Sequence, residues 1–342
     1  MRALVTGGTG CVGSALVERL LEKGFEVRAL ARKSSDLRHL KTTGAEIVFG
    51  DVTDYESLAA AARGVDVVFH AAAKVTPGWG TWEEFEKTTV RGTENLLKAA
   101  AAGGATRFLQ VSSFTVYGDA CVKGDVPADE TTECAVSLTP KTYYDYAKLL
   151  AERTCWEYHR QGQIPVSMIR IGIAYGPRDR LTADRLYIQT LIPLVVWPGK
   201  ANPKFAVIYT SDVAELAILA ATTDKAIGQV YNVAPPQNHR MKDLTRAMMK
   251  AQGGPKVLVT LPFTLCLVGA ILIENVARLM RTKGTPFLNR NIMLQLAKDG
   301  NLDGTKARTE LGWAPRVSLE DGMHKYVQWR RHRKTSPQPP PV

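Results

Sequence analysis

A glycine-rich turn between a strand-like run and a helix-like run constrains this chain more than any other feature. Residues 2–6 read as a buried strand, and TGGTGCVG follows at once, with Gly7, Gly10 and Gly13 spaced G-x-x-G-x-x-G. In such a turn the first glycine bends the chain sharply, the second lets backbone N–H groups approach a pyrophosphate, and the third lets the helix lie close to the sheet. A phosphate is favoured there because the helix N-terminus offers unpaired N–H groups. The sequence therefore predicts a dinucleotide-binding turn.

The first 170 residues alternate between strand and helix patterns. Amphipathic stretches such as 14–23 and 82–102 separate apolar strand-like runs, which lie at 2–6, 26–30, 46–50, 65–70, 107–111 and 165–170. Strands that are apolar on both faces and separated by helices are typical of a parallel, doubly wound sheet. We therefore expect an α/β protein with a Rossmann-type sheet.

The same patterns suggest how the chain is organised. We expect residues 1–170, with a returning segment at 205–235, to form the dinucleotide-binding domain. Residues 171–204 and 236–330 would build a smaller, mainly helical C-terminal substrate lobe, and 331–342 a basic, Pro-rich tail. The site would then lie between the two parts, at the carboxyl ends of the strands.

The end of the second predicted strand bears on the choice of nicotinamide. A carboxylate at this tip would bind the ribose 2′-hydroxyl of NAD, but the tip is Ala31, followed by Arg32 and Lys33. Two cations suit a 2′-phosphate, so NADP is favoured over NAD, and a solvated basic turn is the competing interpretation. Asp51 is placed to accept from the adenine amino group, with an ordinary N-cap as the alternative.

The stretch TYYDYAKLLAE at 142–152 contains three tyrosines and a lysine. Only Tyr144 stands four residues before Lys148, the spacing that brings two side chains to one face of a helix. An ammonium close to a phenol favours the ionised phenol, which makes Tyr144 a candidate proton donor and acceptor. A Tyr-x-x-x-Lys pair also arises by chance in a chain of this composition, so the pair needs a site around it.

The charge balance limits the classes of partner. The chain carries 44 Lys and Arg against 33 Asp and Glu, a net charge of +11, part of which lies in the terminal WRRHRKTSPQPPPV. No interleaving of aromatic and basic residues and no zinc-finger spacing accompanies this charge, so we expect a small-molecule substrate and no nucleic acid. A homodimer is a further partner that we consider.

The cysteines and the first residues bear on location. The five cysteines are odd in number and far apart, with no C-x-x-C pair, which argues against a disulfide framework and a zinc site. We therefore expect no metal and a cytoplasmic location. The opening MRALVTGG leads directly into a strand pattern, so no signal peptide is expected.

Residues 257–273, VLVTLPFTLCLVGAILI, form an uncharged apolar run interrupted by Pro262 and Gly269. The run is shorter than the roughly 20 residues that span a bilayer. We expect helix here, as a buried core segment, as a wall of an apolar cleft, or in peripheral contact with a membrane.

The sequence resembles the extended short-chain dehydrogenase/reductases. The resemblance covers most of residues 1–235 and rests on an ordered set of motifs: TGGTGCVG (6–13), GDVTD (50–54), VFHAAA (68–73), RGTENLLKAA (91–100), VSSFTVYG (111–118), Tyr144-x-x-x-Lys148, IRIGIAYGP (169–177) and IYTSDVAE (208–215). Such an ordered set is far more specific than any one motif, and it implies that Tyr144 and Lys148 form a catalytic pair.

The resemblance implies a role for each matching residue. Ser113 would hydrogen-bond the reacting oxygen, Tyr144 would exchange the proton, and Lys148 would bind the nicotinamide ribose and lower the pKa of Tyr144. His70 is expected to be structural. The implied cofactor-binding residues are Gly7, Thr9, Gly10, Cys11, Val12, Gly13, Arg32, Lys33, Asp51, Val52, Ala71, Ala72, Ala73, Tyr144, Lys148 and Ile171.

Two positions depart from the family's usual pattern. Thr89 in TTVRGT stands where the family often has Asn, and Ile171 follows Arg170 where the family often has Pro. The departure at Thr89 would alter a helix bulge or a proton relay through water. The departure at Ile171 would alter the wall of the nicotinamide pocket. Neither removes a catalytic group.

The C-terminal region is similar to 3β-hydroxysteroid dehydrogenase-like and related 3-oxoacyl or dihydroflavonol reductase-like members. This similarity implies hydride transfer between a nicotinamide and a bulky apolar alcohol or ketone. A nucleotide-sugar epimerase or dehydratase with retained NAD(P) is the alternative, with Arg178 or Arg240 as a diphosphate ligand. A binding module without chemistry is a third hypothesis, which the intact Ser113, Tyr144 and Lys148 disfavour.

Overall fold

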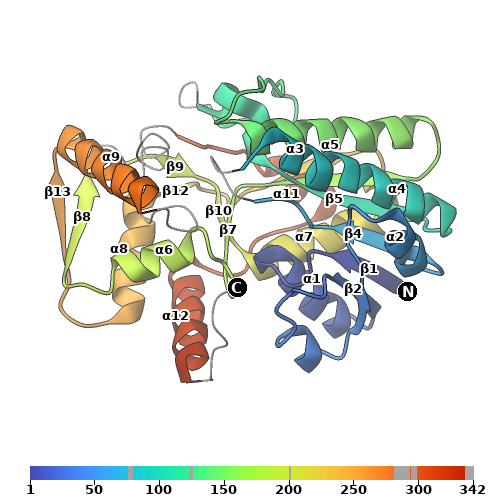
Figure 1. Ribbon diagram of the computed structural model, residues 1–342, viewed down its shortest axis with the longest axis horizontal. Coiled ribbons are helices and arrows are strands. Elements are labelled where there is room, and N and C mark those ends of the chain that lie inside the picture. The colour runs from blue at the N-terminus through green and yellow to red at the C-terminus, as the bar shows by residue number, and fades with distance from the viewer. Residues whose placement is uncertain (76–79, 123–125, 200–201, 281–292, 294–298, 336–342) are drawn as a thin grey trace.

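A seven-stranded parallel sheet organises the larger part of the molecule (Figure 1). A computed structural model of the chain describes residues 1–75, 80–122, 126–199, 202–280, 293 and 299–335. The strand order is β11-β6-β5-β4-β1-β2-β3, so the chain runs outward from β1 in both directions. The predicted Rossmann-type fold is confirmed. The strands are β1 (Arg2–Thr6), β2 (Glu26–Ala31), β3 (Glu46–Phe49), β4 (Val67–His70), β5 (Arg107–Ser113), β6 (Val166–Ile171) and β11 (Val230–Val233).

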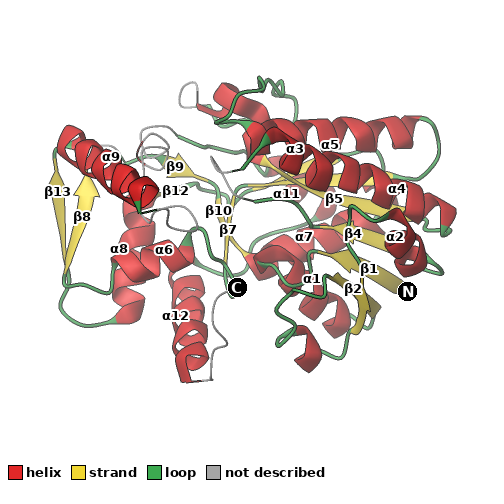
Figure 2. Ribbon diagram, viewed as in Figure 1, coloured by secondary structure: helices red, strands yellow, loops and turns green. Residues whose placement is uncertain are grey.

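Helices cover both faces of this sheet (Figure 2). On one face α1 (Cys11–Glu22) packs against α7 (Thr210–Thr222), and on the other α2 (Tyr55–Ala62) and α5 (Tyr143–Arg160) flank α4 (Gly92–Ala102). Each face has its own apolar core, which explains why the strands are apolar on both sides. The short α3 (Trp82–Phe85) and a π-helical turn, Glu86–Arg91, lead into α4.

A smaller lobe lies beside the sheet, on the left in Figure 1. Its own core includes Tyr187, Leu244, Met248 and Tyr326. The pair β7 (Ile173–Tyr175) and β10 (Val207–Tyr209) connects the two parts, and α11 (Thr305–Leu311) packs back on β11. The lobe contains α6 (Ala183–Gln189), α8 (Met241–Gln252), α9 (Phe263–Leu279) and α12 (Leu319–Thr335), with the strand pairs β8 (Leu194–Pro198) with β13 (Val257–Leu261) and β9 (Lys204–Phe205) with β12 (His239–Arg240).

Two sequence expectations about this lobe need correction. Residues 257–273 are not helical throughout, because their first five residues form β13, which pairs in parallel with β8. Pro262 follows the strand, and α9 begins immediately after it. The basic run at 331–335 belongs to α12 instead of a tail, and residues 336–342 lie outside the described part.

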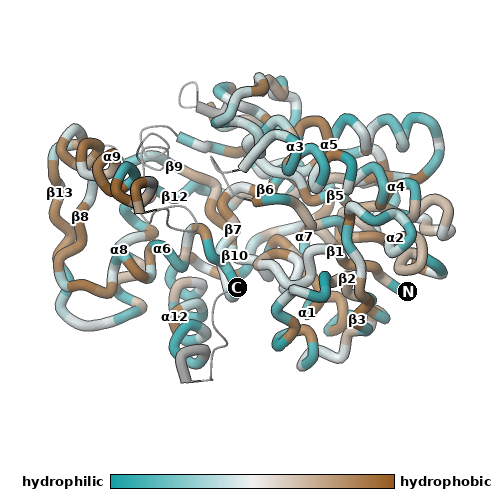
Figure 3. The backbone as a smooth tube through the Cα atoms, viewed as in Figure 1, coloured by the Kyte–Doolittle hydropathy of each residue, from teal (hydrophilic) through white to brown (hydrophobic). Residues whose placement is uncertain are grey.

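One face of α9 is apolar and exposed. Figure 3 shows this helix as one of the most hydrophobic segments of the lobe. In the described part of the chain, no helix is both long and apolar enough to pass through a bilayer. The exposed side chains follow a helical spacing: Leu265, Val268, Leu272, Val276 and Leu279.

Candidate active site

A cavity of about 1650 Å³ lies at the carboxyl ends of the sheet strands and extends into the smaller lobe. Thr6, Ala31, Ser113 and Ile171, at the ends of β1, β2, β5 and β6, all line it. This is the edge where an open parallel sheet binds its ligands. Of the residues predicted for catalysis or cofactor binding, all line the cavity except Lys33, which is exposed beside it.

The glycine turn shows a close fit between the backbone of β1, α1 and the segment after β4. Gly7 has φ +75°, and a Cβ there would lie 2.8 Å from backbone atoms of Ala71 and Ala72. A Cβ on Gly13 would meet the carbonyl oxygen of Gly7 at 2.1 Å. Gly10 precedes α1 and gives it no side-chain cap, so the first N–H groups of the helix are left for another acceptor. This cradle fits the pyrophosphate of a dinucleotide.

The predicted adenosine end of the cavity contains Arg32 and Asp51. Arg32 is exposed and lines the cavity, whereas Ala31 before it is buried. Asp51 also lines the cavity, and its Oδ1 accepts hydrogen bonds from the amide and hydroxyl of Thr53, both at 2.9 Å. The N-cap of α2 is Asp54, so the alternative that Asp51 caps this helix is wrong.

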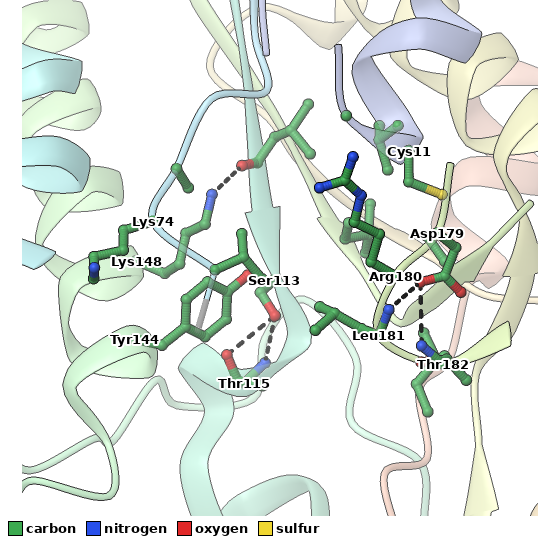
Figure 4. A pocket seen from close by; sticks show the side chains of 18 of the residues that line it. Cys11, Lys74, Ser113, Thr115, Tyr144, Lys148, Asp179, Arg180, Leu181 and Thr182 are labelled. Carbon is green, nitrogen blue, oxygen red and sulfur yellow. Dashed lines mark hydrogen bonds between the residues drawn. The ribbon is translucent and has the colours of Figure 1, made fainter. Parts of the chain in front are cut away.

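Tyr144 and Lys148 lie in the first two turns of α5, and both reach the cavity (Figure 4). Lys148 is buried, and its Nζ donates to the carbonyl of Val111 in β5 at 2.8 Å. Burial lowers the pKa of Lys148 to about 8, against the opposing effect of Glu152 one turn further along the helix. The pair predicted from its spacing therefore lies beside the end of β5.

The pKa of Tyr144 differs from the expectation. Burial raises it to about 12, while a hydrogen bond with Ser113 opposes the rise. Lys148 does not lower this pKa in the structure, since its ammonium is directed to the Val111 carbonyl. The protein's own groups thus hold Tyr144 as a neutral phenol, which is the form that can donate a proton.

Tyr143 and Tyr146 pack against Trp82 and do not line the cavity. The indole of Trp82, at the start of α3, packs on the ring of Tyr143 at 5.9 Å between centroids and on that of Tyr146 at 5.5 Å. Neither tyrosine lines the cavity. Of the three, only Tyr144 combines access to the cavity with the spacing to Lys148.

Ser113 ends β5 and begins a hydrogen-bonded group that the sequence did not reveal. Its Oγ accepts from the hydroxyl of Thr115 at 3.0 Å and from the Thr115 amide at 3.3 Å. Asp145, in the first turn of α5, also lines the cavity. Burial raises the pKa of Asp145 to about 6, and Thr115 opposes this rise. An acidic residue in the first turn of a helix is common, so nothing in the sequence singled out Asp145.

Buried polar side chains hold the strand ends in place. His70 lies between the hydroxyls of Thr6, at 2.6 Å, and Thr93, at 3.0 Å. Burial lowers the pKa of His70 to about 3, so it is neutral at physiological pH. Thr93 also donates to the carbonyl of Thr89 within the π-helical turn. His70 thus ties β1 to β4 and α4.

The far end of the cavity is lined largely by apolar side chains, with Arg185 and Gln189 of α6 among them. α6, β8 and the segment between them contribute side chains that continue the cavity away from Tyr144: Leu186, Ile188, Ile192, Leu194, Val196 and Trp197. Among the described residues, no group of three or more His, Cys, Asp and Glu side chains is placed to hold a metal ion. The apolar part of the space beyond Ser113, Tyr144 and Lys148 suits a bulky apolar group.

The two arginines considered for a diphosphate have other contacts. Arg178, at φ +69°, donates to the hydroxyl of Ser14 at 2.6 Å and to Glu18 at 3.0 Å, and so ties the segment before α6 to α1. Arg240 donates to the carbonyl of Asn202 and does not line the cavity. Arg178 does line it, together with Arg180 and Arg185.

Comparison with known proteins places this site in a family. Residues 3–234 match the NAD dependent epimerase/dehydratase family. The chain belongs to that family. It is an NAD(P)-dependent enzyme of the extended short-chain dehydrogenase/reductase type, as the ordered motifs predicted.

The chain is similar in sequence to reductases and similar in fold to a solved epimerase. A 2-alkyl-3-oxoalkanoate reductase of Stenotrophomonas maltophilia is 30% identical, with 95% of this chain and 98% of the relative covered. A 4-hydroxy-2-methyl-3-oxo-4-farnesyl-3,4-dihydroquinoline-1-oxide ketoreductase of Stigmatella aurantiaca is 27% identical, with 94% and 95% covered. A UDP-glucuronic acid 4-epimerase of Bacillus cereus, in complex with UDP-glucuronic acid and NAD, has a TM-score of 0.75 at 23% identity, with 97% and 100% covered, and shares the fold.

Proposed function

We propose that this enzyme transfers a hydride between NADP(H) and a bulky apolar alcohol or ketone of the steroid-like, 3-oxoacyl or flavonoid-like kind. The observation that carries the proposal is the shape of the cavity. It starts at the glycine turn, passes Ser113, Tyr144 and Lys148, and ends against the apolar side chains of α6 and β8. The relatives named as 3-oxoalkanoate reductase and ketoreductase support the same substrate class.

The roles of the three reacting side chains follow from their positions. When bound, the nicotinamide supplies or accepts the hydride. Addition of a hydride to a carbonyl carbon places negative charge on the oxygen, and a positioned hydroxyl together with an acidic proton stabilises that charge. Ser113 provides the hydroxyl and Tyr144 provides the proton. Lys148, held at the Val111 carbonyl, is within reach of the segment where we place the nicotinamide ribose.

The preference for NADP(H) rests on the turn after β2. Arg32 lines the cavity, whereas Ala31 offers no carboxylate to a ribose hydroxyl. A guanidinium is well suited to a 2′-phosphate. We assign Arg32 this role and give Lys33 a minor one, because Lys33 does not line the cavity.

The alternative is a nucleotide-sugar epimerase or dehydratase that retains its NAD(P). Arg180 and Arg185 favour it, since both line the cavity and could meet a diphosphate. The apolar wall opposes it, because a sugar needs polar partners for its hydroxyls.

Turnover of external cofactor distinguishes the two functions. The purified enzyme should consume NADPH in the presence of long-chain 3-oxo acids or flavonoid ketones, or reduce NADP⁺ with hydroxysteroids. An epimerase would instead convert UDP-sugars with no net change in nicotinamide absorbance. Conversion of UDP-sugars without activity on any of the apolar compounds would contradict the proposed function.

We also propose that the exposed face of α9 makes a peripheral contact with a membrane, in an otherwise cytoplasmic protein. Its apolar side chains lie in the lobe whose β8 and α6 wall the cavity, and Cys266 of α9 lines the cavity itself. An apolar substrate could then reach the cavity from the lipid. A homodimer formed through the same face is the competing arrangement.

A further inference from the structure

Four aliphatic side chains line the cavity and are at the same time open to solvent, so they mark its mouth. They lie in the segment before α6, on α6, in the segment after it and at the start of β8: Leu181, Ile188, Ile192 and Leu194. Each is between 38% and 58% exposed. A single exposed aliphatic side chain is ordinary on a protein surface, but several at one opening indicate a binding surface. We call these four residues the apolar rim.

The apolar rim continues one wall of the cavity. Alternate residues of a strand point to the same face of its sheet. On β8 these are Leu194, Val196 and Pro198, and all three line the cavity. Leu194 is exposed, Val196 is half-buried and Pro198 is buried. Because β8 contains no charged residue, it forms an apolar path from the mouth of the cavity towards its interior.

The polar side chains of this wall are more buried than the apolar rim. Arg185 and Gln189 stand four residues apart on α6, so they share one side of the helix, and both are half-buried. Gln189 donates to the carbonyl of Val196 at 3.2 Å, which ties it to β8. Ile188, on the same helix, is exposed. A ligand that extends outward past Arg185 and Gln189 therefore meets aliphatic side chains at the mouth.

The helix that carries part of the apolar rim is fixed at its N-terminal end. Asp184 accepts a hydrogen bond from the hydroxyl of Tyr326 at 2.9 Å and from Nε of Arg330 at 2.7 Å, and both donors belong to α12. The buried Asp179 accepts from the amides of Leu181 at 2.8 Å and Ala183 at 2.7 Å. The rim is thus held by the fold before a ligand arrives, which lowers the entropic cost of binding.

We propose that the apolar rim is the subsite for a flexible alkyl chain of the substrate, whose reacting carbon lies at Ser113 and Tyr144. This inference rests on the proposed function and narrows its substrate class to molecules with a long linear chain. A chain gains buried area one methylene at a time along an open apolar surface. A fused ring system has a fixed reach from its reacting carbon and cannot extend along the wall in this way.

The experiment measures kcat/KM with NADPH for a series of methyl 3-oxoalkanoates of increasing chain length. In the wild type kcat/KM should rise by about two- to fourfold per added methylene while the chain is covered by the rim, and then level off. Ile188→Asn and Ile192→Asn should flatten this rise, so that the longest and shortest substrates differ less. Leu191→Asn is the matched control, because Leu191 is 50% exposed beside Ile192, at 58%, but does not line the cavity.

A second measurement is independent of turnover. The Kd of straight-chain alcohols for the complex of the enzyme with NADP⁺, measured by protein fluorescence, should fall with chain length in the wild type and in Leu191→Asn, and much less in Ile192→Asn. If no ketone is reduced, the proposed function fails while this series still tests the apolar rim.

Three outcomes would overturn the inference. The first is a wild-type series that is flat in chain length, and the second is an equal loss in Leu191→Asn and Ile192→Asn. The third is an Ile192→Asn variant that keeps the chain-length series but no longer floats with phosphatidylserine vesicles or no longer dimerises, which would assign Ile192 to a lipid surface or to a second copy of the chain.

Discussion

Glu152 on α5 and Arg170 on β6 form a two-point ion pair inside the protein, with Nε to Oε1 at 3.0 Å and Nη2 to Oε2 at 2.7 Å. Their side chains are only 3% and 7% exposed. Arg170 also donates to the hydroxyl of Tyr117, which donates to Asn232 on β11. This network joins α5, which carries Tyr144 and Lys148, to the strands beneath it.

Breaking this pair should destabilise the fold. Glu152→Gln removes one charge and leaves the Arg170 guanidinium buried, which typically costs about 3–5 kcal/mol. The free energy of unfolding in urea measures the effect. Glu22→Gln is the control, since Glu22 pairs with Arg19 at the surface and should cost no more than about 1 kcal/mol. Equal losses in the two variants would show that the buried pair has no special role.

Tyr144→Phe should abolish turnover and leave cofactor binding intact. The substitution keeps the ring and removes the proton, so kcat should fall by at least about 10²–10⁴-fold, the usual contribution of general acid–base catalysis. Tyr143→Phe and Tyr146→Phe should stay close to wild type, because these rings pack on Trp82 outside the cavity. Loss of turnover in either control, with activity retained in Tyr144→Phe, would refute the catalytic assignment.

Arg32→Ala should weaken NADP(H) selectively. A charge-assisted hydrogen bond contributes about 1.5–3 kcal/mol, which is roughly a 10- to 100-fold change in Kd. The Kd for NAD(H) should change little, and titration of protein fluorescence with each nicotinamide measures both. Lys33→Ala is the matched control, because Lys33 is the adjacent cation but lies outside the cavity. Equal weakening of NAD(H) and NADP(H) by Arg32→Ala would exclude a phosphate contact.

Lys148→Met should impair turnover but stabilise the fold at neutral pH. Burial lowers the pKa of Lys148 from 10.5 to about 8, so the folded state binds this proton less readily than the unfolded state. The resulting loss in the free energy of unfolding is fully present below pH 8 and disappears as the pH rises towards 10.5. The Tm advantage of Lys148→Met should therefore be largest at pH 7 and shrink between pH 8 and 10.5. A Tm advantage that grows between pH 8 and 10.5 would contradict a lowered pKa for Lys148.

The exposed face of α9 should bind lipid. Replacement of Leu265, Val268 and Leu272 by Ser should reduce flotation of the protein with anionic phosphatidylserine vesicles, since each fully buried leucine contributes about 1.5–3 kcal/mol. Sedimentation of the wild type without vesicles is the companion measurement. A dimer that the same substitutions dissociate, with no flotation in the wild type, would assign the face to a second copy of the chain.

The sequence predicted the structure correctly where a local constraint allows a single conformation. Gly7 and Gly13 predicted the turn because no side chain fits there, and the spacing of Tyr144 and Lys148 predicted their shared face. At 257–261 the local signal was ambiguous, since a short apolar run suits a strand or a helix, and pairing with β8 decides the matter. Thr115, in the turn after β5, and Asp145 of α5 line the same cavity because these two segments pack together, which no spacing along the chain encodes.

Ser113, Tyr144 and Lys148 all belong to β5 and α5, while the apolar wall of the cavity comes from α6 and β8 of the smaller lobe. With the proposed roles, reactivity and selectivity are thus encoded in separate stretches of the gene. Drift or recombination in the stretch for the lobe can then change which molecules are accepted while Ser113, Tyr144 and Lys148 stay fixed.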